Sequence, residues 1–343
     1  MAKPSSVPAS KGTGSVFNVA VDVGRSSVKI ATEGTRMQFP FLLATKKTST
    51  ADYYAPGDAI QKWAEVDGHQ YFFGEEASLL GDTVIQHTEG AAFKETSITV
   101  TVFSIAYAMF SQGKRYTTAN VAINLTFDNH FQKDEYAKHL KGKHKVRFVR
   151  EGDTFEFTID QVFVLYQGFS GLLSVAMDEN FRIRKEYLEG EGVVVDIGRQ
   201  TIDFLFLDRM VVKHGSSKDF GTFKVYEKVS ELLKKKHGVM KEAYEIEDHL
   251  TRGRPITQLT TGEKIQVEPL VKEAVAYYFN DVMLHFSTFL SKDTPDYLIL
   301  LGGGALVYGA FFKTKYKLVE IPDDPQFSNA AGMYRFITRM AGK

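Results

Sequence analysis

The sequence predicts an α/β fold in which one β-hairpin motif occurs in both halves of the chain. Residues 19–30 and 193–204 share the same order: an apolar strand, then Asp-x-Gly-Arg-x-[Ser/Thr]-[Val/Ile], then a second strand of alternating polarity. A third apolar strand, residues 297–301, runs into three glycines and the start of a helix. The chain has 343 residues, which is long enough for two domains.

The composition indicates a globular chain and excludes several functional classes. The 42 basic and 42 acidic residues leave a net charge of zero, so we expect no direct binding to nucleic acid or to an anionic membrane. The absence of cysteine excludes a disulfide framework and a thiolate nucleophile, and it suits the cytoplasm. Residues 1–15 are expected to form a flexible polar tail, and the apolar stretch 100–110 is too short to span a membrane.

The first hairpin has the residues that a phosphate site requires. Gly24 lets the backbone approach a bulky anion, and the tip amides and the hydroxyls of Ser26 and Ser27 can donate to it. Asp22 would be repelled by a phosphate but can hold a hydrated Mg²⁺. Lys29, on the outgoing strand, can neutralise phosphate charge. A single hairpin of this kind is more often an ordinary turn, whereas two copies in the same order favour a binding function.

The second hairpin repeats this arrangement. Asp196 takes the place of the metal-holding aspartate, and Gly198, Gln200 and Thr201 form the tip. Asp203 completes the motif on the outgoing strand and is included among the binding residues.

The three glycines after residues 297–301 form the third candidate element. Gly302, Gly303 and Gly304 precede a helix, so their amides and the helix N-terminus could face an anion or a flat base. Three glycines alone are most often a tight turn. Their position after two phosphate-type hairpins makes them candidate binding residues.

In this order of elements the chain resembles the ATPase core shared by actin, the heat-shock chaperone ATPases and the sugar kinases. It looks most like the ParM-type plasmid-segregating bacterial actins, because residues 196–203 are similar to their second phosphate loop and residues 321–325 and 329–332 to the start of their last helix. The sequence departs from the family in two respects. Arg25 and Arg199 replace small residues and could either clamp phosphate or point outward, and residues 124–128 replace a Thr-Gly-Leu-Pro-like turn.

The resemblance implies two related domains that face each other across a nucleotide cleft. The first domain would comprise residues 16–190 and 328–343, with a smaller outer subdomain at about 39–99. The second would comprise residues 191–327, with an outer subdomain at about 227–268.

The resemblance also implies a ligand and a reaction. ATP, with GTP as the alternative, would bind between the hairpins with Mg²⁺ held through water by Asp22 and Asp196, and the three glycines would border the nucleoside. The attacking water needs a polar side chain in line with the γ-phosphate. Gln167 is the candidate because it follows the apolar strand 162–166 at the start of the next helix, and Asp196 could share this role.

The implied partners are further copies of the chain in a filament and an adaptor protein bound to plasmid centromeric DNA. Three alternatives share the ATP site: a small-molecule kinase of the sugar-kinase type, a cell-shape actin and a chaperone-type ATPase. The kinase would need a dedicated catalytic aspartate and a polar acceptor pocket, neither of which stands out in the sequence.

Two further segments carry structural expectations. A helix from about 268 to 290 should pack an apolar and aromatic stripe on the second domain's sheet, with members Leu270, Val271, Ala274, Tyr277, Tyr278, Val282, Leu284 and Phe286. The lysine runs at 141–145, expected on a loop, and at 234–236, expected on a helix, are interpreted as solvated faces.

Overall fold

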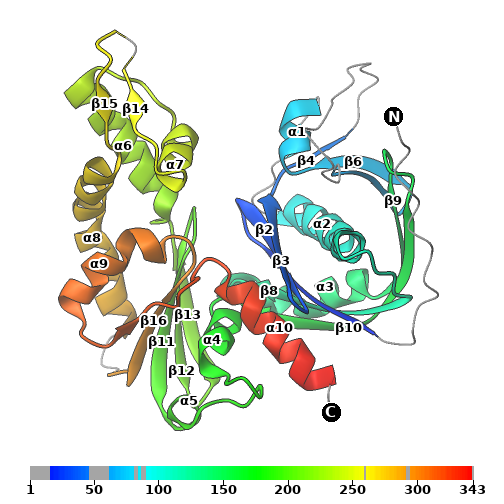
Figure 1. Cartoon of the computed structure of the whole chain (residues 1–343). Helices are drawn as coiled ribbons and strands as arrows, with labels where there is room; N and C mark the ends of the chain where they lie inside the picture. Colours follow the sequence, from blue (N-terminus) through cyan, green and yellow to red (C-terminus); the bar gives the residue numbers. More distant parts are fainter. Residues whose placement is uncertain are drawn as a thin grey trace. The chain divides into compact units, whose positions relative to one another are not determined.

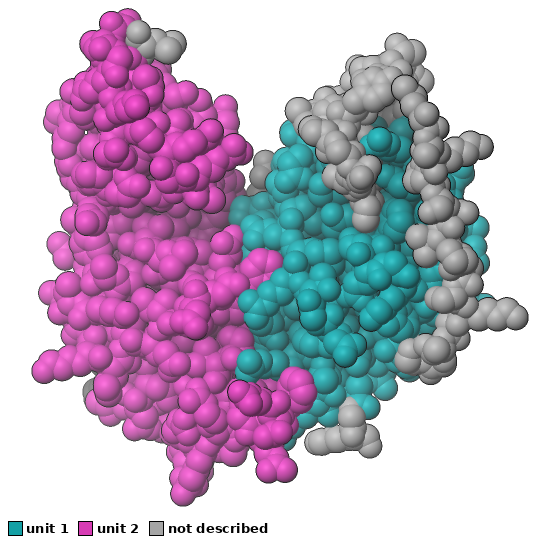
Figure 2. Space-filling view, in the orientation of Figure 1, with its two compact units in different colours: residues 1–125, 129–166, 330–343 teal, residues 126–128, 167–329 magenta. Residues whose placement is uncertain are grey.

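The computed structural model describes residues 16–45, 62–80, 84–85, 90–258, 260–290 and 294–341. The chain divides into two compact units, coloured separately in Figure 2. Unit 1 contains residues 1–125, 129–166 and 330–343, and unit 2 contains residues 126–128 and 167–329. The predicted domain boundaries after residues 190 and 327 stay predictions, and the expected polar tail 1–15 lies outside the described residues.

Unit 1 is built on a mixed sheet of ten strands in the order β3-β2-β1-β8-β10-β9-β5-β6-β4-β7 (Figure 1). Strands β1, β8 and β10 are parallel, and the remaining neighbours pair in antiparallel fashion. The strands are β1 Phe17–Val23, β2 Ser27–Thr32, β3 Thr35–Pro40, β4 Leu43–Thr45, β5 Trp63–Val66, β6 His69–Phe73, β7 Val84–Ile85, β8 Thr118–Leu125, β9 Gly142–Phe148 and β10 Thr154–Tyr166.

The helix α2, Gly90–Ser111, lies inside the curve of this sheet (Figure 1). Its apolar stretch is buried, and the Phe103 ring stacks on Phe73 with their centroids 3.8 Å apart. The stretch 100–110 is therefore a core helix, and no helix in the described part of the chain is long and apolar enough to cross a membrane. The other helical segments associated with this unit are α1 Glu75–Leu80, the 3-10 helix η1 Phe127–Gln132, α3 Lys133–Leu140 and α10 Ser328–Ala341.

Unit 2 is built on a sheet of five strands in the order β13-β12-β11-β16-β17, in which β11, β16 and β17 are parallel. Its strands are β11 Glu191–Ile197, β12 Ile202–Asp208, β13 Val211–Lys218, β16 Tyr297–Leu301 and β17 Val319–Glu320, with a separate pair of β14 Ile256–Thr257 and β15 Lys264–Ile265. Its helices are α4 Phe169–Ala176, α5 Lys185–Glu189, α6 Thr222–His237, α7 Ala243–Thr251, α8 Glu268–Leu290 and α9 Ala305–Lys315.

The expected helix at 268–290 is confirmed as α8, but its predicted buried stripe is partly wrong. Phe286 is buried against Phe204 of β12, with ring centroids 5.6 Å apart. Tyr277 and Leu284, which we expected in the stripe, are 63% and 65% exposed. They lie seven residues apart, two helical turns, and therefore share the outer face of the helix.

The two lysine runs also have different outcomes. Residues 234–236 lie in the exposed last turn of α6, as expected. The run at 141–145 is not a loop, because residues 142–148 form β9, which pairs with β10 and β5. Exposed and buried side chains alternate along this strand, with Lys143 and Lys145 exposed and Val146 and Phe148 in the core. The exposed lysines of the strand explain why the run was expected on a loop.

Candidate functional site

The first hairpin forms as predicted from β1 and β2. Asp22 stands opposite Lys29 in the antiparallel ladder, and the Lys29 Nζ lies 3.5 Å from the Asp22 Oδ2. The Asp22 side chain is buried, and the Gly24 amide donates to the Ser27 carbonyl oxygen at 3.0 Å, which closes the tip around Ser26. This hairpin thus presents a carboxylate that is already paired with an ammonium group.

The parallel pairing of β1, β8 and β10 brings three chain segments to one edge of the unit 1 sheet. Val21 is in register with Ile123, and Ile123 with Val164, so the carboxyl ends of these strands lie at the same edge. The hairpin tip follows β1 at this edge, and Gln167 directly follows β10. Gln167 is assigned to unit 2 by its contacts, and its predicted role in catalysis stays a prediction.

A histidine that the sequence did not single out lies at this same edge. The His130 ring stacks on Tyr166 with centroids 3.6 Å apart, and its Nε2 lies 3.4 Å from the carbonyl oxygen of Val164. Burial lowers the pKa of His130 from its usual value, and the charge of Lys133 acts in the same direction. His130 is therefore held as a neutral ring beside the last residue of β10.

The second hairpin, formed by β11 and β12, has a different charge pattern. Asp196 stands directly opposite Asp203, and both side chains are buried. The Thr201 hydroxyl donates to the Asp203 Oδ2 at 3.0 Å, and the Gly198 amide donates to the Thr201 carbonyl oxygen at 2.9 Å. This hairpin therefore has two carboxyl groups opposite each other, where the first hairpin has a carboxylate opposite an ammonium group.

The tip of the second hairpin is fixed to the start of α6. The amides of Gly221, Thr222 and Phe223 donate to the carbonyl oxygens of Gln200, Gly198 and Arg199 at 3.0, 3.1 and 2.8 Å. Backbone groups at a helix N-terminus have no partner inside the helix, so the tip carbonyls satisfy them. The arrangement holds the tip in one conformation.

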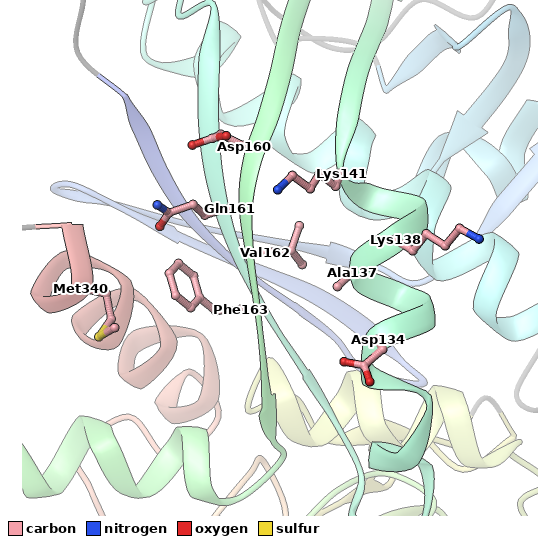
Figure 3. A pocket seen from close by; sticks show the side chains of 9 residues that line it. All are labelled: Asp134, Ala137, Lys138, Lys141, Asp160, Gln161, Val162, Phe163 and Met340. Atoms are coloured by element: carbon pink, nitrogen blue, oxygen red, sulfur yellow. The ribbon is translucent and has the colours of Figure 1, made fainter.

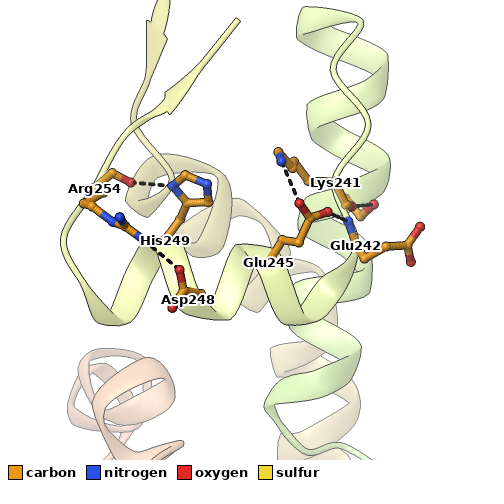
Figure 4. A network of polar contacts seen from close by, with 7 residues as sticks. Lys241, Glu242, Glu245, Asp248, His249 and Arg254 are labelled. Atoms are coloured by element: carbon orange, nitrogen blue, oxygen red, sulfur yellow. Dashed lines mark hydrogen bonds and ion pairs between the residues drawn. The ribbon is translucent and has the colours of Figure 1, made fainter. Parts of the chain in front are cut away.

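The side chain of Arg199 contacts α7. Its Nε lies 3.1 Å from the Glu247 Oε2, and its guanidinium lies 5.0 Å from the centroid of Phe223. The start of α7 is fixed by a capping box between Glu242 and Glu245 (Figure 4). Of the two roles left open for Arg199, clamping phosphate or pointing away from it, this geometry favours the second.

The glycine loop packs on the carboxyl end of β11. The Gly304 amide donates to the Ile197 carbonyl oxygen at 2.9 Å, and Leu301 is in register with Asp196. Gly302 has a φ of +76°, and a Cβ there would lie 2.4 Å from the Ile197 carbonyl oxygen and 2.5 Å from the Asp196 Oδ1. A Cβ on Gly303 would meet nothing closer than 3.8 Å. Gly302 is therefore required for close packing on β11, whereas Gly303 borders open space.

A buried amide that the sequence did not single out contacts the candidate metal-holding carboxylate. The Asn329 Nδ2 donates to the Asp196 Oδ2 at 2.6 Å. The Asn329 Oδ1 accepts from the Gly168 amide at 3.1 Å and from the Ser170 hydroxyl at 2.7 Å. Asn329, Asp196 and Ser170 are all buried. The signal was an asparagine among the small residues of the first turn of α10, but no pattern in the sequence pairs it with Asp196.

Apart from Gln167, which follows a strand of unit 1 but is assigned to unit 2, the predicted residues gather at one sheet edge in each unit. Unit 1 holds Asp22, Gly24, Ser26, Ser27 and Lys29, and unit 2 holds Gln167, Asp196, Gly198, Gln200, Thr201, Asp203, Gly302, Gly303 and Gly304. Among the described residues no three histidine or acidic side chains cluster as a metal site. Within unit 2, a Cβ at position 302 would lie 2.5 Å from the Asp196 Oδ1, so only glycine fits beside this carboxylate.

A cavity of about 640 Å³ lies elsewhere in unit 1, between α3, β10 and α10 (Figure 3). Its lining includes Asp134 and Lys138 of α3, Asp160 and Phe163 of β10 and Met340 of α10. It contains none of the hairpin or glycine-loop residues, and its mixture of two charge signs with apolar side chains selects no ligand class.

Comparison with protein families assigns both halves of the chain. Residues 20–169 match the family described as actin-like proteins, N-terminal domain. Residues 194–314 match the family described as archaeal actin homologue MreB-like, C-terminal. Each match contains one of the two hairpins. No curated protein matches the chain.

Solved structures of this fold cover nearly the whole chain. Ta0583, an archaeal actin homolog, in complex with ADP has a TM-score of 0.72 at 19% identity, covering 95% of this chain and 100% of its own. Bacillus thuringiensis ParM with AMPPNP has a TM-score of 0.70 at 18% identity, covering 96% and 99%. The apo psk41 ParM protein has a TM-score of 0.71 at 17% identity, covering 95% and 98%. The predicted α/β, actin-like fold is thereby confirmed.

Proposed function

Because the chain belongs to the actin-like protein family, we propose that it is an ATPase that assembles into filaments in a nucleotide-dependent way and drives plasmid DNA segregation in the cytoplasm. The observation that carries the proposal is the pair of Asp-x-Gly hairpins, each at the carboxyl edge of its own sheet, with the glycine loop packed beside the second. The nucleotide complexes of Ta0583 and Bacillus thuringiensis ParM support a nucleotide ligand.

Each unit would supply one half of the nucleotide site. Gly24, Ser26, Ser27 and Lys29 would bind phosphate from unit 1, and Gly198, Gln200 and Thr201 from unit 2. Gly302, Gly303 and Gly304 would border the nucleoside, with Gly303 nearest to open space. Tip amides and the Lys29 ammonium are donors of the kind that phosphate oxygens accept.

A magnesium ion would be held through water by Asp22 and Asp196, and when bound it would neutralise charge that develops on the phosphates. The two hairpins should contribute unequally. Lys29 already balances Asp22, whereas Asp196 faces Asp203 across the ladder. We therefore propose that the second hairpin supplies most of the attraction for the cation.

Hydrolysis requires a water held in line with the γ-phosphate. Gln167 would orient this water from the start of the segment that leads into α4, and Asp196 would share the role. If both hairpins bind the same phosphates, the nucleotide determines how the two units are held and thereby which subunit shape can polymerise. A head-to-tail contact that does not close into a ring then gives an open filament.

Plasmid segregation would need an adaptor on centromeric DNA, because the net charge of zero offers no general attraction for nucleic acid. The likeness to two ParM proteins supports this part of the proposal. ATP is proposed over GTP because the nucleotide complexes among the structural neighbours contain ADP and AMPPNP.

The test is right-angle light scattering of the purified protein after addition of Mg-ATP, with sedimentation and phosphate release on the same sample. A rise in scattering that decays as phosphate appears would support a dynamic filament. Hydrolysis with a flat scattering trace would contradict filament formation and favour a kinase or chaperone-type activity. Repetition with Mg-GTP would decide the nucleotide.

A single substitution separates assembly from hydrolysis. Asp196→Ala should still assemble with ATP, since the remaining tip donors bind phosphate, but phosphate release should slow because the metal-bound water loses its carboxylate. Normal phosphate release by this variant would exclude Asp196 from the assigned role.

A further inference from the structure

The Asn329 side chain connects three parts of unit 2 that are far apart in the sequence. Its Nδ2 donates to the Asp196 Oδ2 at the end of β11, and its Oδ1 accepts from the Gly168 amide and the Ser170 hydroxyl at the start of α4. These hydrogen bonds use both acceptor sites and one of the two N–H donors of a buried amide, and an unmatched polar atom is costly in such a setting. The amide is therefore held in a single orientation.

Two of these residues adjoin places where the chain passes between the units. The chain leaves unit 1 after Tyr166 and enters unit 2 at Gln167, immediately before Gly168. It returns to unit 1 between Asn329 and Ala330, inside helix α10. The hydrogen bond between the Gly168 amide and the Asn329 Oδ1 thus joins these two passages. The Asn329 Nδ2 extends the connection to Asp196, because it donates to the Asp196 Oδ2.

Gly168 cannot easily move away from this position. Its φ is +81°, a conformation that favours glycine, and a Cβ there would lie 3.1 Å from the Leu205 side chain of β12. Gly171, one turn later, would place a Cβ 2.3 Å from Leu301 and 3.0 Å from the Asn329 Oδ1. Close packing on β11, β12 and β16 therefore holds the start of α4 against Asn329.

We infer that Asn329 is a positioning residue that orients the Asp196 carboxylate and connects it to two of the chain passages between the units, those at 166/167 and 329/330. The inference rests on the proposed function, in which Asp196 holds the magnesium ion through water. Asn329 would act on hydrolysis through Asp196, without contacting the nucleotide. Through the helix that it begins, it would also transmit the state of the phosphate site into unit 1.

The donor and the acceptor of Asn329 can be tested separately in the full-length protein. Asn329→Ala removes both, whereas Asn329→Asp keeps oxygens that accept from Gly168 and Ser170 but loses the donor to Asp196. Outer-shell partners of metal sites typically contribute about 10–100-fold to activity. We therefore expect kcat to fall at least tenfold in both variants, with KM for Mg-ATP within about threefold of wild type.

Amide hydrogen exchange at Gly168 provides a readout that does not depend on hydrolysis. Exchange should accelerate at least tenfold in Asn329→Ala and stay near the wild-type rate in Asn329→Asp. Asn120→Ala is the matched control, because it also removes a buried amide that donates to a neighbour, the Asn18 Oδ1 at 3.1 Å, but in the unit 1 sheet. This control should lower the thermal midpoint and leave both kcat and Gly168 exchange unchanged.

The outcomes separate this inference from the proposed function. A kcat within twofold of wild type in both Asn329 variants, or an equal loss of kcat in Asn120→Ala, would overturn the positioning role. If the wild-type protein binds no nucleotide or does not hydrolyse it, the proposed function fails. The exchange experiment still tests whether Asn329 holds the Gly168 amide. Exchange at Gly168 as slow in Asn329→Ala as in wild type would then overturn the inferred connection.

Discussion

At the scale of single residues, adjacent glycines of the loop that follows β16 should respond differently to the same added methyl group. Gly302→Ala forces a Cβ to within 2.4 Å of the Ile197 carbonyl oxygen at a φ of +76°. We expect a loss of about 1–3 kcal/mol in the free energy of unfolding, together with at least tenfold weaker ADP binding, because relief of the clash moves β11 and Asp196. Urea unfolding and titration with a fluorescent ADP analogue measure the two effects.

Gly303→Ala is the control for this substitution. Its Cβ would meet only the Gln326 side chain at 3.8 Å, and its φ lies outside the left-handed region. Stability should stay within about 0.5 kcal/mol of wild type. Equal effects of the two substitutions would show that the loop adapts as a whole, contrary to the packing of Gly302 on β11.

His130 should make the stability of unit 1 sensitive to mild acid. Burial holds its pKa below the usual 6.5, so the native state favours the neutral ring, with Lys133 assisting and Asp134 and the Val164 carbonyl opposing. Its contribution is fully present above about pH 6.5 and is lost as the pH falls through the lower native pKa. Wild type should therefore lose more stability between about pH 7.5 and 5 than His130→Phe, which keeps a ring against Tyr166 but cannot titrate.

The measurement is urea unfolding of both proteins at the two pH values. Because every other titrating group is shared, the difference between the two losses isolates His130. A variant that loses as much stability as wild type would show that the ring is equally easily protonated in the native and unfolded states.

At the scale of elements, the contacts of the second hairpin predict that Arg199 stabilises α7 and contributes little to the nucleotide site. Its ion pair with Glu247 is partly exposed, with side-chain exposures of 19% and 35%. A double-mutant cycle of Arg199→Ala and Glu247→Ala should give a coupling of about 0.5–1 kcal/mol by urea unfolding. The Kd for ADP should stay within twofold of wild type in each variant. A tenfold weaker Kd in Arg199→Ala alone would assign the guanidinium to phosphate binding.

The elements that the sequence predicted best are those whose pattern is local. The two hairpins, the strand before the glycines and α8 all have a periodicity that is complete within one segment. The errors arose where long-range packing decides the outcome. Tyr277 and Leu284 are apolar enough for a core, but they occupy a face of α8 that stays exposed, where the Lys228 ammonium lies over the Tyr277 ring. Residues 142–148 became a strand because β10 and β5 flank them.

The candidate site shows the same division. Asp22, Gly24, Asp196 and Gly198 are recognisable because their spacing within a hairpin is fixed by the turn. Asn329 is 133 residues from Asp196, and their hydrogen bond depends on how α10 begins against β11 and α4. No local pattern contains that information. The partner of Arg199, on a helix 48 residues further along the chain, was unpredictable for the same reason.

At the scale of the whole molecule, the proposal that each unit supplies half of the nucleotide site predicts that nucleotide restricts the motion of the units relative to each other. The absence of cysteine allows two engineered cysteines to be labelled without background, and Lys143→Cys in unit 1 with Lys235→Cys in unit 2 uses exposed positions. Single-molecule energy transfer at concentrations too low for polymerisation should show a narrower distribution with Mg-AMPPNP than without it, because both hairpins then bind the same phosphates.

Lys29→Ala in the doubly labelled protein provides the control for this last prediction. The substitution removes the ammonium that the first hairpin would offer to phosphate, while the hairpin and the glycine loop of unit 2 are unchanged. Nucleotide can then still bind to unit 2 but engages unit 1 weakly, so the distribution should stay broad even at saturating Mg-AMPPNP. Narrowing in this variant equal to that in wild type would mean that unit 2 alone responds to the nucleotide. An unchanged distribution in the parent protein, with binding confirmed by titration, would contradict a site shared between the two units.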